Sequence, residues 1–366
     1  MADNKKLLVQ LLRLAIVGDV ENPKTFANMD WLGIMEELAN QTVLGVVWGG
    51  VEACPALASL LSIDDKLEFF GQTRKIVERN KEVNKALADV VSTLNAAGIN
   101  SILLKGQGCA SFYPNPMYRS PGDIDLLVGK DNFHKAQGCL KEAGLVGDWI
   151  HEDIMHGMLS CDDVTLELHK YPAFLMTKKT DDSFQDVVRK CLQQDYSRCP
   201  RIRINDADVA LLPVELNTVF TFFHMFKHFV GSGIKIRQVV DWLVMCKSIG
   251  DKALLAQYVK DFGIEHAWKV FAQMAVEHIG VPASQVPLYE AGYSKKAEKV
   301  LRVLLKGDML DLTTEENPSL WKKIRYATNL YVAHLRSLGT FPKESMLSIG
   351  VLLRINVGKY LLGRMK

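Results

Sequence analysis

The stretch that most constrains this chain runs from Ser101 to Val128, SILLKGQGCASFYPNPMYRSPGDIDLLV. Its pattern predicts a strand, a glycine turn that opens a short helix, a loop with several prolines, and a second strand. Asp123 and Asp125 lie two residues apart in the second predicted strand, so both carboxylates project to the same side. Two carboxylates a few Å apart repel each other unless a cation or a shared proton reduces the repulsion. The stretch therefore predicts a divalent metal site, with Mg²⁺ as the first candidate; the alternative is a solvated strand end.

The turn that follows the first predicted strand has the composition of an anion site. The apolar residues 102–104 end at Lys105-Gly106-Gln107-Gly108. Small residues at such a turn let backbone N–H groups approach an anion, and the next helix offers the partial positive charge of its N-terminus. Lys105 adds a full positive charge at the same place.

A third carboxylate is predicted further along the chain. Residues 149–159 and 164–170 have strand patterns and are joined by Cys161-Asp162-Asp163, which predicts a hairpin. Glu167 and His169 alternate with apolar residues and therefore share one face of the second hairpin strand. If that strand lies beside the Asp123–Val128 strand, Glu167 joins the two aspartates.

This order of motifs resembles the nucleotidyltransferase superfamily that includes the DNA polymerase β catalytic domain. The pattern of that superfamily is a glycine turn, then D-x-D, then an acid on a later strand. The chain is most similar to a bacterial group described only as uncharacterised nucleotidyltransferases, whose members share its Lys105-Gly106, Tyr113-Pro114, Arg119, Asp123–Val128 and Glu167-Leu168-His169. One position departs from the wider superfamily, which has Gly-Gly or Gly-Ser where this chain has Gly106-Gln107.

The resemblance implies a role for each matching residue. The implied metal ligands and catalytic acids are Asp123, Asp125 and Glu167, with Mg²⁺ or Mn²⁺ as the cofactor. The implied nucleotide-binding positions are Lys105, Gly106, Gln107, Arg119, His169, His224 and His228. The implied partners are a nucleoside triphosphate and an acceptor that the sequence does not identify, which is a small molecule, a protein or RNA.

The predicted fold class is α+β. Strand patterns are confined to about residues 100–204, and helix patterns lie on both sides. We therefore expect a small mixed sheet of the nucleotidyltransferase palm type, flanked by N-terminal and C-terminal helical regions. The expected units are an N-terminal helical region at 1–98, a nucleotidyltransferase catalytic core at 99–207 and a C-terminal helical region at 208–366.

The predicted helix at residues 214–231 carries two histidines on one face. His224 and His228 are four residues apart, which alone invites a zinc interpretation. The metalloprotease pattern requires Glu directly after the first histidine, and Met225 stands there instead. Two interpretations remain, a packed structural pair and a helix that faces phosphate or substrate. Because a C-terminal helical unit must cover the nucleotide to exclude water, we expect this helix to face the cleft.

Bulk properties exclude several classes of protein. The 366 residues carry a formal net charge of +2, so no global basic field supports nucleic-acid binding. No apolar run approaches the length of a membrane span, which argues against integral membrane association. The seven cysteines are scattered and form no C-x-x-C pair, a pattern that favours free thiols in a reducing cytoplasm.

Three functions remain from the sequence. The first is a metal-dependent nucleotidyltransferase that moves a nucleoside monophosphate onto a hydroxyl and releases pyrophosphate. The second is a non-catalytic nucleotide-binding or regulatory module, which the unusual Gln107 favours and the three acids disfavour. The third is an RNA-modifying nucleotidyltransferase, which the near-neutral charge disfavours.

Overall fold

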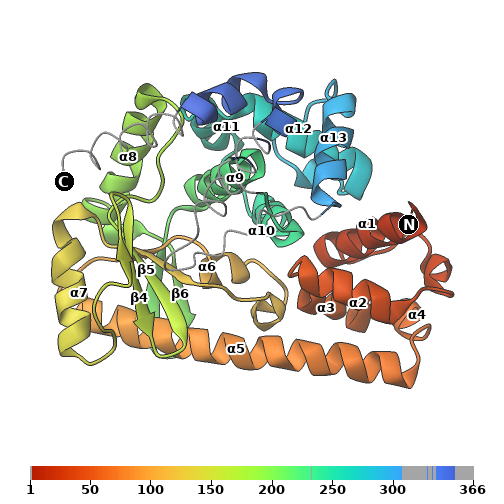
Figure 1. Ribbon diagram of the computed structural model, residues 1–366, viewed down its shortest axis with the longest axis horizontal. Helices are drawn as coiled ribbons and strands as arrows, with labels where there is room; N and C mark the ends of the chain where they lie inside the picture. The colour runs from red at the N-terminus through yellow and green to blue at the C-terminus, as the bar shows by residue number, and fades with distance from the viewer. Residues whose placement is uncertain (1, 232, 307–327, 329–331, 333–334, 351–366) are drawn as a thin grey trace.

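The computed structural model describes residues 2–231, 233–306, 328, 332 and 335–350. Within them, one mixed sheet is flanked by helices, which confirms the predicted fold class (Figure 1). The strands of the sheet, in chain order, are β1 (Ile102–Leu103), β2 (Ile124–Leu127), β3 (His151–Glu152), β4 (His156–Cys161), β5 (Val164–His169), β6 (Arg201–Ile204) and β7 (Ala207–Leu211). Their order across the sheet is β3-β4-β5-β2-β1-β7-β6.

The centre of the sheet combines parallel and antiparallel pairs. Strand β2 runs parallel to β5 and antiparallel to β1, and β1 runs parallel to β7. All four residues of β2 are buried, as expected of a strand covered on both faces. The pairing sets Asp125 directly opposite Glu167, so the two predicted carboxylate positions are neighbours across one strand gap.

The N-terminal helices end in one long helix that reaches under the sheet. They are α1 (Ala2–Val17), α2 (Trp31–Asn40), α3 (Leu44–Ala53), α4 (Pro55–Ala58) and α5 (Ile63–Ala96). Helix α5 begins with a capping box between Ser62 and Asp65, which satisfies free N–H groups of its first turn. Its first half packs Phe69 against Trp48, and its second half, from Val83 to Leu94, joins the core beneath the sheet. Figure 1 shows α5 running along the bottom of the view, below the N-terminal helices α2 and α3 and below the sheet.

The remaining helices divide between the two sides of the sheet, with α7 on the same side as α5. They are α6 (Gln107–Ala110), α7 (Phe133–Glu142), α8 (Lys178–Gln193), α9 (Val214–Val230), α10 (Ile236–Cys246), α11 (Lys252–Asp261), α12 (Glu265–Met274) and α13 (Ser294–Leu304). Phe222 of α9 packs against Trp242 of α10 and Trp268 of α12 in an aromatic core. This core fixes the orientation of α9, whose other face borders the site described below.

Three details of the strand prediction were wrong. The sheet extends past residue 204, because β7 continues to Leu211 and pairs with β1. Asp123 precedes β2, which begins at Ile124. The predicted strand at 149–159 is divided into β3 and β4 by a turn in which Asp153 accepts hydrogen bonds from two backbone N–H groups. The division into three units stays a prediction, and residues 351–366 lie outside the described part of the chain.

Candidate active site

The predicted acids Asp125 and Glu167 meet on the face of the sheet opposite α5. Asp125 in β2 is buried and Glu167 in β5 is half-buried. One carboxylate oxygen of each, together with a ring nitrogen of His169, lies within 4.8 Å of the others. Carboxylate oxygens and imidazole nitrogens are the ordinary protein ligands of divalent cations, so this donor set fits a metal ion. The predicted pairing of the two strands is confirmed, and with it the neighbourhood of two of the three acids.

The imidazole ring of His169 lies between the two acids and contacts both through one nitrogen. Its Nε2 lies 3.1 Å from Asp125 Oδ1 and 3.4 Å from Glu167 Oε2. Its Nδ1 lies 3.3 Å from the backbone oxygen of Tyr171. Burial alone would lower the pKa of His169, but the hydrogen bonds to the two acids raise the pKa to about 9. At neutral pH without metal, His169 is therefore a cation that partly neutralises the carboxylates.

Lys105 is the second cation of the acid cluster. It follows β1 at the glycine turn, and its Nζ lies 2.7 Å from Asp125 Oδ1 and 3.4 Å from His224 Nε2. Burial by itself raises the pKa of the Asp125 carboxyl, yet the charges of Lys105 and His169 bring that pKa below its ordinary value. The same attraction raises the pKa of Lys105 despite its burial. Asp125 is thus ionised and Lys105 is charged at neutral pH.

Asp123 lies apart from this group. It is exposed, it lines the same pocket, and it is not among the three residues whose donor atoms lie within 4.8 Å of one another. The charge of Asp125, followed by burial, raises the pKa of Asp123 to about 6. Its predicted role as a metal ligand stays a prediction, and His169 takes its place in the group that the structure assembles.

Helix α9 forms the opposite wall of a pocket of about 390 Å³. His224, Lys227 and His228 all line this pocket, so the expectation that the two histidines face the cleft is confirmed. Burial, followed by the charge of Lys105, lowers the pKa of both histidines, to about 4 for His228. They are therefore neutral imidazoles at neutral pH, and Lys227 supplies the positive charge of this wall.

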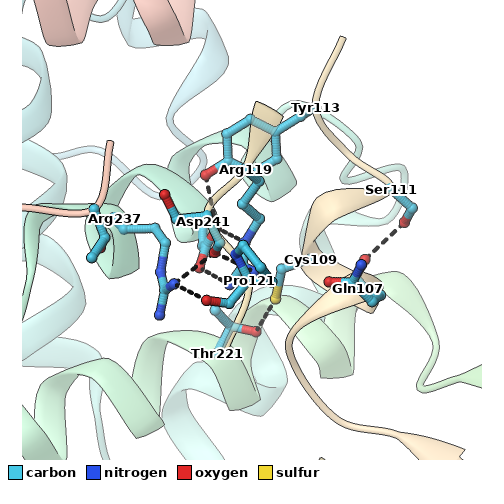
Figure 2. Close-up of polar contacts among 12 residues, drawn as sticks. Gln107, Cys109, Ser111, Tyr113, Arg119, Pro121, Thr221, Arg237 and Asp241 are labelled. Carbon is cyan, nitrogen blue, oxygen red and sulfur yellow. Dashed lines mark hydrogen bonds and ion pairs between the residues drawn. The ribbon is translucent and has the colours of Figure 1, made fainter. Parts of the chain in front are cut away.

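Arg119 forms a closed ion pair at the side of the pocket. Its Nε and Nη2 donate to the two carboxylate oxygens of Asp241 at 2.7 and 2.8 Å, and the Tyr113 hydroxyl donates to Asp241 at 2.7 Å (Figure 2). Both charged groups are buried. These contacts commit the guanidinium to Asp241, so the structure does not favour the predicted contact of Arg119 with phosphate.

Arg237 on α10 reaches the pocket next to this pair. Its Nη1 donates to the backbone oxygen of Ser120 at 2.7 Å, and its Nε is buried with no hydrogen-bond partner among the described residues (Figure 2). Arg237 thus holds the loop before Asp123 in place, and its side chain lines the pocket.

Two residues of the glycine turn that are predicted to hold the triphosphate, Gly106 and Gln107, differ in what they contact. Gly106 has φ +56°, and a Cβ added there would lie 3.3 Å from the backbone oxygen of Asp123, so the turn needs glycine for close approach. Gln107 points the other way: its Nε2 donates to Asn80 and Asn84 of α5. These contacts anchor the Gln107 side chain to α5, and the predicted role of Gln107 in holding the triphosphate stays a prediction.

Three basic residues that line the pocket were not predicted as site residues: His156, Lys227 and Arg237. The Nε2 of His156 lies 3.8 Å from Glu167 Oε1, and its ring stacks on that of His169. The alternation of β4 carries a signal for it, since His156 and Glu167 project to one face of the paired strands. For Lys227 the signal is its position one helical turn from His224.

The chain was compared with models of protein families, with curated proteins and with solved structures. The model of a family described as uncharacterised nucleotidyltransferases matches residues 27–280, which is more than half of the chain. The chain belongs to this family. The match includes the sheet, the acids and helices α9 and α10, and it supports nucleotidyl transfer as the general activity. No curated protein and no solved structure matches the chain.

Among the described residues, no helix has the length and apolar character to cross a membrane.

Proposed function

We propose that the chain is a metal-dependent nucleotidyltransferase that transfers a nucleoside monophosphate from a nucleoside triphosphate to an acceptor hydroxyl and releases pyrophosphate. The observation that carries the proposal is the parallel pairing of β2 with β5, which sets Asp125 beside Glu167 at a pocket with basic residues on its opposite wall. Membership of the nucleotidyltransferase family supports it. Transfer of this kind needs charge neutralisation and in-line positioning more than a special nucleophile, and this pocket offers both signs of charge.

The acids form the half of the pocket that holds the cation. Asp125 and Glu167 hold a divalent cation, Mg²⁺ or Mn²⁺, and Asp123 adds a carboxylate at the mouth. When bound, the cation neutralises negative charge on the phosphates and so lowers the barrier to attack. Glu167 is half-buried and faces the pocket, which suits it to accept the proton of the attacking hydroxyl.

The basic half of the pocket holds the triphosphate. Lys105 from the glycine turn after β1, Lys227 from α9 and Arg237 from α10 bring three positive charges to one cavity. Because His224 and His228 are neutral, they bind phosphate oxygens by donating hydrogen bonds and add no charge. Gly106 lets the backbone of the turn approach the phosphates. Arg119 and Asp241 position the loop and α10 without touching the nucleotide.

A search for the product tests the proposal. Wild-type protein is incubated with each nucleoside triphosphate, Mg²⁺ or Mn²⁺, and a cell extract, and the mixture is analysed by mass spectrometry. A molecule in the extract should gain the mass of one nucleoside monophosphate, and Asp125→Asn should abolish this gain. Nucleotide binding without any modified product would contradict transfer and favour the non-catalytic module.

A further inference from the structure

We propose that His169 is a metal ligand of this site, and that the site therefore takes a first-row divalent transition cation such as Mn²⁺ in preference to Mg²⁺. The inference deepens the proposed function, since it concerns the cation of the same pocket. It departs from the all-carboxylate set that the sequence predicts, in which Asp123 is the third ligand.

The spacing of the donor atoms fits one shared ion. Ligands about 2.1 Å from a common metal lie about 3.0 Å apart in an octahedral site and about 3.4 Å apart in a tetrahedral one. His169 Nε2 lies 3.1 Å from Asp125 Oδ1 and 3.4 Å from Glu167 Oε2. His169 Nε2 thus already stands at ligand spacing from a donor of each carboxylate before any ion is added, and all three donors lie within 4.8 Å of one another. Asp123, by contrast, contributes no atom to this group.

The other ring nitrogen of His169 is the second observation. A histidine that binds metal through one nitrogen generally gives its other N–H to a carboxylate or backbone carbonyl, which fixes the ring and the tautomer. His169 Nδ1 lies 3.3 Å from the backbone oxygen of Tyr171. With the proton on Nδ1, the lone pair of Nε2 faces the space between the two carboxylates. The ring is thus oriented for coordination by a contact outside the acid cluster.

A second imidazole stands next to the group. The ring of His156 stacks on that of His169 with 5.1 Å between centroids, and its Nε2 lies 3.8 Å from Glu167 Oε1. Its Nδ1 is buried without a hydrogen-bond partner among the described residues. His156 is therefore able to orient Glu167 or to add a nitrogen when the side chains adjust to an ion.

The ligand types decide the class of metal. Mg²⁺ prefers oxygen ligands and usually keeps several waters, whereas imidazole suits first-row transition ions. Mn²⁺ accepts carboxylates as readily as Mg²⁺ does and also binds imidazole, so a mixed set of two carboxylates and one imidazole favours it. The competing interpretation is that His169 is only a protonated bridge between the two acids, in which case no nitrogen reaches the metal.

The test measures metal binding to the full chain without nucleotide. Titration calorimetry with Mn²⁺ alone and Mg²⁺ alone should show Mn²⁺ binding at least about tenfold more tightly. Pulsed electron paramagnetic resonance of the Mn²⁺-loaded protein should detect coupling to an imidazole nitrogen. His169→Gln should remove that coupling and weaken Mn²⁺ at least about tenfold while changing Mg²⁺ less, and His134→Gln, an exposed histidine outside the pocket, should change neither.

Several outcomes overturn the inference. They are equal affinity for the two ions, no nitrogen coupling in the wild-type protein, and an unchanged coupling in His169→Gln. If His169→Gln does not fold, the wild-type spectrum decides alone, because a protonated bridge gives no nitrogen coupling to the metal. The two proposals fail separately: transfer with Mg²⁺ and no nitrogen coupling overturns only the metal assignment, and nitrogen-bound Mn²⁺ without transfer overturns only the proposed function.

Discussion

Two ion pairs border the same pocket, a closed and buried pair of Arg119 with Asp241 and an open pair of Lys105 with Asp125, in which Lys105 is half-buried. Arg119 and Asp241 use two parallel hydrogen bonds, and Tyr113 donates a third to the same carboxylate. Lys105 and Asp125 share a single contact of 2.7 Å, and Lys105 also lies within 3.4 Å of His224. The first pair has planar, bidentate geometry, while the second joins a compact ammonium to a carboxylate that other groups also contact.

The difference predicts separate roles for the two pairs, one in the stability of the fold and one in binding and transfer. A closed pair exchanges partners only at a large cost, because removing one partner leaves the other buried and charged. An open pair with further donors and acceptors around it can give up its contact when a better partner arrives. Asp125 is such a group, since Lys105, His169 and an added cation all compete for its oxygens. We therefore expect changes at the closed pair to act on stability and changes at the open pair to act on binding and transfer.

The largest expected effect is the loss of nucleotidyl transfer when Asp125 of the open pair is changed. Asp125→Asn keeps the size of the side chain and removes its charge, so transfer should fall at least about 1,000-fold, equivalent to about 4 kcal/mol. The rate of nucleotide incorporation measures it. Asp208→Asn, an exposed aspartate on β7, is the matched control and should retain full transfer. Comparable rates in the two variants would remove Asp125 from the active site.

The next effect is on stability at the closed pair. Asp241→Asn leaves the Arg119 guanidinium buried without its counter-charge, so the free energy of unfolding should fall by about 3 kcal/mol or more. Urea denaturation measures it, with Asp208→Asn expected to stay within about 0.5 kcal/mol of wild type. A small loss at Asp241 would mean that the closed pair is not structural.

Removing Lys105 from the open pair should raise the affinity for one ligand and lower the affinity for another. Lys105→Met frees Asp125 for a cation, so Mn²⁺ alone should bind about tenfold more tightly, while nucleoside triphosphate should bind more weakly. Calorimetry of each ligand measures both. Lys260→Met, at the exposed end of α11, should change neither affinity. Weaker binding of the metal would show that Lys105 supports the cation site and does not compete with it.

The smallest expected effect is the pH dependence of Asp123. Its pKa is raised to about 6 in the folded protein, so ionisation opposes folding. The penalty is absent below about pH 4, grows between pH 4 and 6, and is complete above pH 6. Since Asp123 is exposed and solvent screens it, Asp123→Asn should gain only about 1 kcal/mol of unfolding free energy at pH 7.5 and nothing at pH 3.5. Urea denaturation at both pH values checks this, and an equal gain at both would exclude the electrostatic cause.

The sequence predicted the part of the site that local patterns encode. The strand period placed Glu167 and His169 on one face, and the apolar strand with its glycine turn placed Lys105 at the end of β1. Strand patterns do not state which strands pair, so the neighbourhood of the Asp123–Val128 strand and the Glu167 strand entered only as a condition. The structure confirms that these strands are neighbours and adds their parallel direction and register.

What the sequence missed are interactions between distant elements. Gln107 follows the glycine turn, yet its side chain turns toward Asn80 and Asn84 on α5, which no local pattern indicates. Arg119 and Asp241 are more than a hundred residues apart, so their bidentate pair follows only from the packing of α10. His156 joined the acids because the turn at Asp153 split one predicted strand into two and set its position in β4.

The most direct test of nucleotidyl transfer follows the label of the nucleotide. The protein is incubated with cation and cell extract, once with nucleoside triphosphate labelled at the α-phosphate and once with the same nucleotide labelled at the γ-phosphate. If Asp125 and Glu167 direct attack to the α-phosphate, the acceptor should carry only the α label, the γ label should appear in pyrophosphate, and Asp125→Asn should lose both signals. Transfer of the γ label to the acceptor, or release of γ-phosphate without any modified acceptor, would contradict nucleotidyl transfer.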